Sequence, residues 1–179
     1  MTTQADSSSP QRRDAGARNA SPLVGKSAPA FVLPDPVTKD SVALESFADQ
    51  DILLLFLRGT WCPFCVQQLQ VLKDNFEKLR GANVAVVAVV CQSQITVQLF
   101  LKGFPLPFPL LCDGSRAVAR EYGTHYWLSH EGFNLSHPAL FILDKTRTVT
   151  FAHVGRSMSD LPVSRILEKF VGLLGDDKG

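Results

Sequence analysis

Two cysteines with two residues between them, Cys62 and Cys65, are the residues of this sequence best suited to chemistry. A cysteine attacks as its thiolate, and its ordinary pKa of about 8.5 means that a reactive thiol needs something nearby to stabilise negative sulfur. Spacing of three residues at the start of a helix also allows the close Cβ approach that a disulfide requires. The pair is therefore a candidate redox dithiol.

The residues around the pair indicate a helix that begins beside Cys62. Pro63 is favoured at the first helical position because its missing N–H would have no partner there. The unpaired N–H groups and the partial positive charge of that first turn would stabilise a Cys62 thiolate. Arg58 and Trp61 would add positive potential and shielding. We predict that Cys62 is the exposed, attacking thiol and that Cys65, which begins an apolar helical series, is its buried partner.

Two other interpretations of the pair stay open. A zinc site would need a second pair of ligands at a comparable spacing, whereas Cys91 and Cys112 stand alone and the four histidines form no metal pattern with them. The two cysteines could also be inert members of the core. Cys91, at a strand end, could act as a third thiol, although burial as a small apolar residue is the simpler interpretation for it and for Cys112. No metal and no cofactor is predicted.

Length and charge restrict the class of protein. A chain of 179 residues suits one domain, and its formal net charge of +1 gives no reason to expect nucleic acid or an anionic membrane surface as a partner. No apolar run approaches the roughly 20 residues of a membrane-spanning helix. Residues 1–22 carry no large aliphatic side chain after Met1 and no secretory signal, so we predict a disordered tail before a domain at 23–179, in the cytoplasm.

The elements that must position the pair follow from the apolar pattern. Residues 51–57 form a continuously apolar strand, as expected when both faces of a sheet are covered. A helix with apolar positions at spacings of three and four then runs to Gly81, followed by a strand at 84–90. The remaining elements are expected as an entry strand at 31–33, helices at 95–102, 113–123 and 162–174, and a hairpin of strands at 139–144 and 149–154. This order predicts a three-layer α/β fold around a mixed sheet.

The stretch "GTHYWLSHEGFNLSHP" joins two of these elements and holds three histidines and three aromatic residues. Its irregular composition predicts a loop that could roof a site. Each of its histidines alone, like His153 in the closing strand, is more simply a surface or capping residue.

At these residues the chain resembles the thioredoxin superfamily, and over nearly all of 23–174 it is similar to the AhpC/TSA, or peroxiredoxin-like, branch. The entry segment "LVGKSAPAFVLPD", the strand and helix "LLLFLRGTWCPFCVQQLQVL", the segment "FPLPFPLLCDGSRAVAREYG" and the hairpin "PALFILDKTRTVTFAHVG" carry the resemblance. It implies a thioredoxin-like three-layer sandwich with an N-terminal extension. The short motif of residues 61–65 is close to those of thioredoxins and glutaredoxins.

The sequence departs from each subfamily at a different place. Typical peroxiredoxins have a proline, a threonine four residues later and the attacking cysteine three beyond; aligned on Cys65, this chain has Arg58 and Cys62 at the first two places. Where those enzymes carry an arginine before the later strand, this chain has Pro138, which resembles the cis-proline that faces the dithiol in thioredoxins. The buried acid of thioredoxins would fall near Phe56 and is absent.

The resemblance implies a thiol-dependent oxidoreductase that reduces a hydroperoxide or a protein disulfide, with thioredoxin, glutaredoxin or glutathione as the reductant. The predicted catalytic residues are Cys62, Cys65 and Arg58. The predicted supporting residues are Thr60, Trp61, Pro63 and Pro138. A non-catalytic redox sensor or binding module with the same fold is the alternative, and sustained turnover would distinguish the two.

Overall fold

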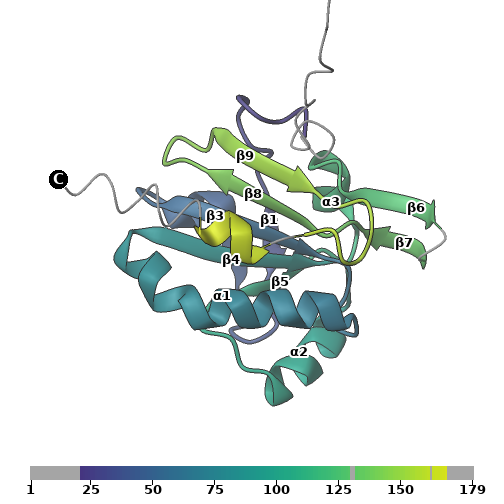
Figure 1. Cartoon of the computed structure of the whole chain (residues 1–179). Helices are drawn as coiled ribbons and strands as arrows, with labels where there is room; N and C mark the ends of the chain where they lie inside the picture. The colour runs from purple at the N-terminus through teal and green to yellow at the C-terminus, as the bar shows by residue number, and fades with distance from the viewer. Residues whose placement is uncertain (1–20, 130–131, 162, 169–179) are drawn as a thin grey trace, which may run out of the picture.

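The computed structural model describes residues 21–129, 132–161 and 163–168. Its centre is a five-stranded sheet in the order β5-β4-β3-β8-β9 (Figure 1). The strands are β3 (Asp51–Leu57), β4 (Val84–Val90), β5 (Leu110–Cys112), β8 (Ala139–Leu143) and β9 (Val149–Val154). The first three are parallel to one another, while β8 is antiparallel to β3 and to β9. The predicted mixed sheet and the predicted closing hairpin are confirmed.

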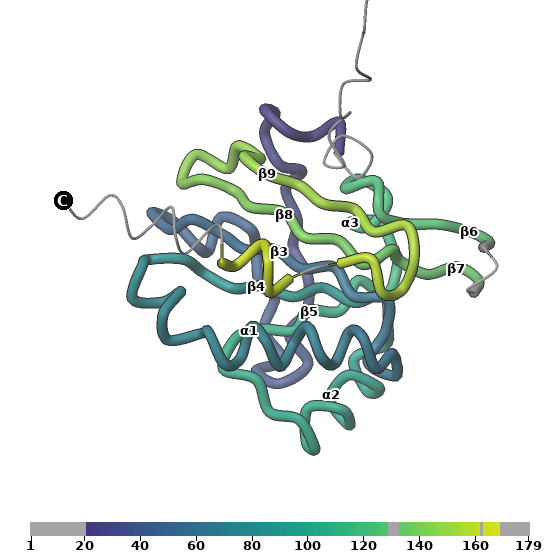
Figure 2. Tube along the Cα trace, viewed as in Figure 1, coloured from purple at the N-terminus to yellow at the C-terminus, as the bar shows by residue number. Residues whose placement is uncertain are grey.

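Two apolar clusters, one on each face of this sheet, make the three layers. Helices α1 (Pro63–Gly81) and α2 (Gln94–Gly103) pack with residues 163–168 on one face, and α3 (Ala117–Glu121) packs on the other. The continuous apolar runs arise because alternate residues of β3 and β4 enter opposite clusters. Figure 2 shows the chain passing between these layers, and the predicted three-layer fold is confirmed.

The N-terminal part of the described chain forms a small sheet of its own. Strand β1 (Val32–Pro34) pairs with β2 (Ser41–Ala43), and the short helix η2 (Leu44–Phe47) follows. The predicted tail at 1–22 falls mostly on residues outside the described part. Ser21, where that part begins, is buried. The described beginning of the predicted last helix is helical at 163–168, and its remainder lies outside the described residues.

One predicted loop is wrong. The histidine-containing stretch after α3 contains two strands, β6 (His125–Ser129) and β7 (Gly132–Ser136), paired as an antiparallel hairpin that extends away from the sheet (Figure 1). Large apolar side chains, Trp127 and Leu128, lie next to one another and are both exposed, so the sequence lacks the apolar and polar alternation that indicates a strand.

Gly155 provides a test of the packing at the end of β9. A Cβ atom there would collide with the carbonyl oxygen of Asp160 and lie 3.0 Å from atoms of Pro138. We expect Gly155→Ala to lower the free energy of unfolding by about 1–3 kcal/mol, as overpacking typically does. Denaturant unfolding measures this loss. Gly81→Ala is the control, because nothing lies within 4 Å of its Cβ position, and a loss of equal size there would contradict the interpretation.

Candidate active site

The dithiol lies where β3 gives way to α1. The helix begins at Pro63, as predicted, and Cys62 is its N-cap residue in an extended conformation, with φ −85° and ψ 118°. The turn before it is closed by the Cys62 N–H, which donates to the carbonyl of Gly59 at 3.2 Å, and the Cys62 carbonyl accepts from the Val66 N–H at 3.1 Å. The short-range preference of proline for a first helical position therefore positions both thiols.

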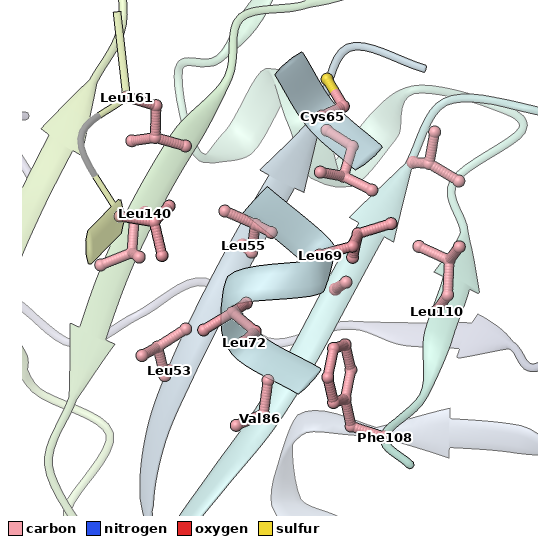
Figure 3. Close-up of a cluster of buried hydrophobic side chains, with 14 of the residues drawn as sticks. Leu53, Leu55, Cys65, Leu69, Leu72, Val86, Phe108, Leu110, Leu140 and Leu161 are labelled. Atoms are coloured by element: carbon pink, nitrogen blue, oxygen red, sulfur yellow. The ribbon is translucent and has the colours of Figure 1, made fainter. Parts of the chain in front are cut away.

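The two cysteine side chains approach to 3.5 Å and are separate thiols. Cys65 is fully buried, as predicted from its place in the apolar series, and Figure 3 shows it at the start of α1, in line with Leu69 and Leu72. The predicted exposure of Cys62 is wrong, because only 1% of that residue is accessible. Cys62 belongs to the same buried cluster as Cys65, so its position before the helix does not leave it open to solvent.

Burial dominates the acidity of Cys65. Burial, together with the nearby Cys62, raises the pKa of this thiol to about 12, although hydrogen bonds from the backbone of Gly59 and Arg58 lower it in part. Because burial outweighs the backbone donors, the Cys65 thiol keeps its proton at neutral pH. Cys65 is therefore the inner sulfur of the pair.

Arg58 is buried, with 2% of its surface accessible, although it carries a charge. Its Nε donates to the hydroxyl of Tyr126 at 3.3 Å, and its Cζ lies 5.2 Å from the centroid of the Trp61 ring. The indole of Trp61 rests against Gly59, where an added Cβ would collide with it. Trp61 thus covers the guanidinium on one side, while 56% of Trp61 itself stays exposed.

Tyr126 and Gln92 are site residues that the sequence did not reveal. Tyr126 comes from the β6–β7 hairpin, and its ring lies tilted against that of His137, with 4.4 Å between the two centroids. Gln92 follows β4, and its Oε1 accepts from the backbone N–H of Thr60 at 2.7 Å. Both hold the segment before the dithiol from distant parts of the chain, and neither stands in a motif that could have identified it.

The predicted cis-proline is wrong, since the described residues contain no cis peptide bond. At the start of β8 the His137 N–H donates to the Thr124 carbonyl, and the Pro138 carbonyl accepts from the Gly155 N–H. Ala139 pairs with Phe56, so Pro138 still lies next to the end of β3. The thioredoxin-like interpretation of this loop loses its main support, which leaves Arg58 and the start of α1 as the inferred site.

Cys91 and Cys112 are core residues. Cys91 belongs to the cluster on the face opposite the dithiol, and burial followed by the charge of Asp113 raises its pKa to about 12. Cys112 is buried in β5, on the dithiol face, where burial followed by the charge of Asp35 raises its pKa to about 11. Cys91 is therefore not placed to serve as a third thiol beside Cys62.

The other predicted candidates are also placed. His125 hydrogen-bonds Asn134 at 2.9 Å, and His153 lies 3.4 Å from a carboxylate oxygen of Asp160; His130 is outside the described residues. Within the described part, no group of three or more His, Cys, Asp or Glu side chains could hold a metal ion. In that part, too, every helix is too short or too polar to cross a membrane.

The raised thiol pKa values predict a loss of stability at high pH. A folded Cys65 keeps its proton to about pH 12, whereas an unfolded cysteine releases it near about pH 8.5. The stabilisation is complete below about pH 8.5 and falls as the pH rises toward 12, because the unfolded state then binds fewer protons. We expect the reduced protein to lose more stability than the Cys62–Cys65 disulfide form between pH 8 and about pH 10.5 in denaturant unfolding. Equal losses in the two forms would contradict the raised pKa of Cys65.

Comparison with known proteins agrees with this geometry. The model of the AhpC/TSA family matches residues 24–152. Among curated proteins, the thiol-disulfide oxidoreductase ResA of Bacillus thuringiensis is 28% identical over 123 residues, 68% of this chain and 64% of that protein. Chloroplastic peroxiredoxin Q of Sedum lineare is 30% identical over 99 residues, 55% of this chain and 53% of that protein. The chain thus spans less than two thirds of either relative.

Solved structures confirm the fold. Peroxidoxin BcpB from Mycobacterium tuberculosis superposes with a TM-score of 0.74 at 18% identity, over 87% of this chain and 98% of that one. The reduced 2-Cys peroxiredoxin of Plasmodium vivax superposes with a TM-score of 0.72 at 20% identity, over 87% and 84%. At these identities the superpositions describe the thioredoxin-like fold alone.

Proposed function

Because the chain belongs to the AhpC/TSA family, we propose that it is a thiol-dependent oxidoreductase that reduces disulfides by cycling Cys62 and Cys65 between dithiol and disulfide. The observation that carries the proposal is the pair itself: two side chains 3.5 Å apart at the start of α1, with the inner one held protonated by burial. The similarity to ResA, whose name states this activity, supports it.

In the proposed cycle, the Cys62 thiolate attacks one sulfur of a disulfide. A bond forms between that sulfur and Cys62, the substrate S–S bond breaks, and the other substrate sulfur leaves as a thiolate. Cys65 then loses its proton and attacks Cys62, which releases the second substrate thiolate and leaves the Cys62–Cys65 disulfide. Two electrons and two protons have passed to the substrate, and an external thiol must return them.

The inner position of Cys65 decides which sulfur attacks first in this cycle. A thiol with a pKa of about 12 supplies almost no thiolate at neutral pH, and the thiolate is the nucleophile. Cys65 reacts only after the mixed disulfide has placed its target within contact distance. Because Cys62 is itself buried, attack also requires the residues that cover it to open locally.

Peroxide reduction is the second candidate, and the similarity to peroxiredoxin Q favours it. In that mechanism Cys65 would attack the peroxide and become a sulfenic acid, which Cys62 would then capture with loss of water. Arg58 would stabilise the leaving oxygen. The raised pKa of Cys65 opposes this order. A redox sensor that is oxidised once without turnover is the non-catalytic alternative.

The reductant and the location belong to the same proposal. Thioredoxin, glutaredoxin or glutathione would return the electrons, and a cytoplasmic location would keep the pair reduced between cycles. These assignments rest on the chemistry of a dithiol that must be regenerated.

The deciding experiment measures insulin-disulfide and hydrogen peroxide turnover side by side, with each thiol reductant in turn. The proposal expects sustained insulin reduction that exceeds peroxide reduction. Faster peroxide turnover would establish the peroxidase instead, and a single oxidation without turnover on peroxide, insulin or a small disulfide would establish the sensor.

A further inference from the structure

Arg58 has no counter-charge in the described part of the chain. The guanidinium donates a hydrogen bond of 3.3 Å to the neutral hydroxyl of Tyr126 and faces the Trp61 ring. It forms no ion pair with a described carboxylate. Burying a charge without a partner is costly, so a cation in this position favours any anion that can reach it.

The charge of Arg58 is not used by the inner thiol. Arg58 lowers the pKa of Cys65 through its backbone alone, and its guanidinium is not among the causes of that shift. Cys91 shows the contrast, because the charges of Arg116 and Arg120 do lower its pKa. The disulfide exchange proposed above likewise gives the guanidinium no step.

We propose that Arg58 binds a carboxylate of the substrate, and that the substrate is a small disulfide carrying this group near its sulfur. The proposal rests on the proposed disulfide reductase and names the class of molecule that it reduces. A guanidinium is a planar fork that matches a carboxylate with two parallel hydrogen bonds. A single guanidinium suits a single negative charge better than a phosphate.

A compact ligand would reach Arg58 past Trp61. Arg58 lies four residues before Cys62, and between them the Cys62 N–H donates to the Gly59 carbonyl and closes a turn. Trp61 covers the guanidinium, but its ring is more than half exposed and no hydrogen bond of its indole is observed among the described residues. The proposal needs this one side chain to rotate so that a compact ligand can reach Arg58, which is the reason for assigning a small disulfide instead of a folded protein as the substrate.

The test compares two disulfides that differ only in charge, 3,3′-dithiodipropionate and its dimethyl ester. The wild-type protein should reduce the acid with a kcat/KM roughly 10- to 100-fold above that for the ester, the range expected of hydrogen bonds to a charged group. Arg58→Met should abolish this preference, mainly through a higher KM for the acid. Arg58→Lys, which keeps the charge but not the fork, should retain only part of it. Arg80→Met is the control, because Arg80 is exposed on α1 and pairs with Glu77.

Three results would overturn the proposal: equal rates for acid and ester in the wild-type protein, equal losses on both in Arg58→Met, or an equal loss on insulin. The second would mean that Arg58 acts on the thiolate, and the third that it serves protein substrates.

Calorimetric binding of glutarate against glutaramide tests the site without chemistry. Tighter binding of glutarate that is lost in Arg58→Met supports the carboxylate site. If that binding is found but neither disulfide is reduced, the disulfide reductase alone is overturned. Equal binding of glutarate and glutaramide overturns the carboxylate site. If Arg58→Met does not fold, Arg58→Lys and the comparison of the two ligands in the wild-type protein still test the site.

Discussion

Replacing Cys62 with serine is expected to abolish disulfide reduction, with a loss of at least about a thousandfold in turnover. A serine hydroxyl stays protonated at neutral pH and cannot take the place of a thiolate in disulfide exchange. Cys65 cannot substitute, since burial raises its pKa to about 12 and keeps it protonated. Reduction of insulin or of a small disulfide, followed with each reductant, measures the loss.

Cys91→Ser is the matched control for this variant, because Cys91 is a buried thiol on the opposite face of the sheet. It should retain turnover where Cys62→Ser does not. Alkylation by iodoacetamide as a function of pH should find Cys62 the faster thiol in reduced protein. If Cys65 is alkylated first at neutral pH, and Cys62→Ser still consumes one equivalent of peroxide, then the order of the thiols is reversed and the peroxidase is the better description.

Replacing Cys65 with serine is expected to trap the reaction half-way. Cys62 would still attack the substrate, but no second thiol would lie at 3.5 Å to displace it. The variant should accumulate a mixed disulfide between Cys62 and one half of the substrate, and its turnover should fall at least about a hundredfold. Intact-mass measurement after exposure to the disulfide detects the added half-molecule.

The wild-type protein provides the comparison. After the same exposure it should carry no adduct and should instead be lighter by two hydrogens, with peptide mapping that places the new bridge between Cys62 and Cys65. A bridge to Cys91 or Cys112, or a Cys65→Ser protein that turns over normally, would contradict the role of Cys65 as the resolving thiol.

Local chemistry explains how much of this site was predictable. The preference of Pro63 for a first helical position depends on its neighbours in sequence, and the predicted helix start was confirmed. The three-residue spacing of the cysteines is likewise a local property, and the two side chains lie 3.5 Å apart. The burial of Cys65 followed from its period with Leu69 and Leu72. The continuously apolar strands likewise predicted a sheet covered on both faces, because the residues themselves carry that pattern.

Contacts between distant segments decided the rest. Arg58 meets Tyr126 across 68 residues, and Thr60 meets Gln92 across 32, and no local pattern specifies such a partner. The burial of Cys62 depends on what packs over the helix start, and the trans Pro138 depends on how β8 enters the sheet. The strands of the β6–β7 hairpin were not predicted because their exposed aromatic residues break the apolar and polar alternation. The exposure of those residues is set by what surrounds the strands in the folded protein, which no local pattern specifies.

The sequence by itself determined where α1 begins and that the two candidate sulfurs stand at its start, because helix initiation and cysteine spacing are short-range properties. Only the tertiary structure decided what surrounds those sulfurs: a buried arginine for which the described residues supply no counter-charge, a tryptophan over it, and a hairpin whose Tyr126 accepts its hydrogen bond. Burial and electrostatic environment are sums over neighbours that the chain brings together only by folding.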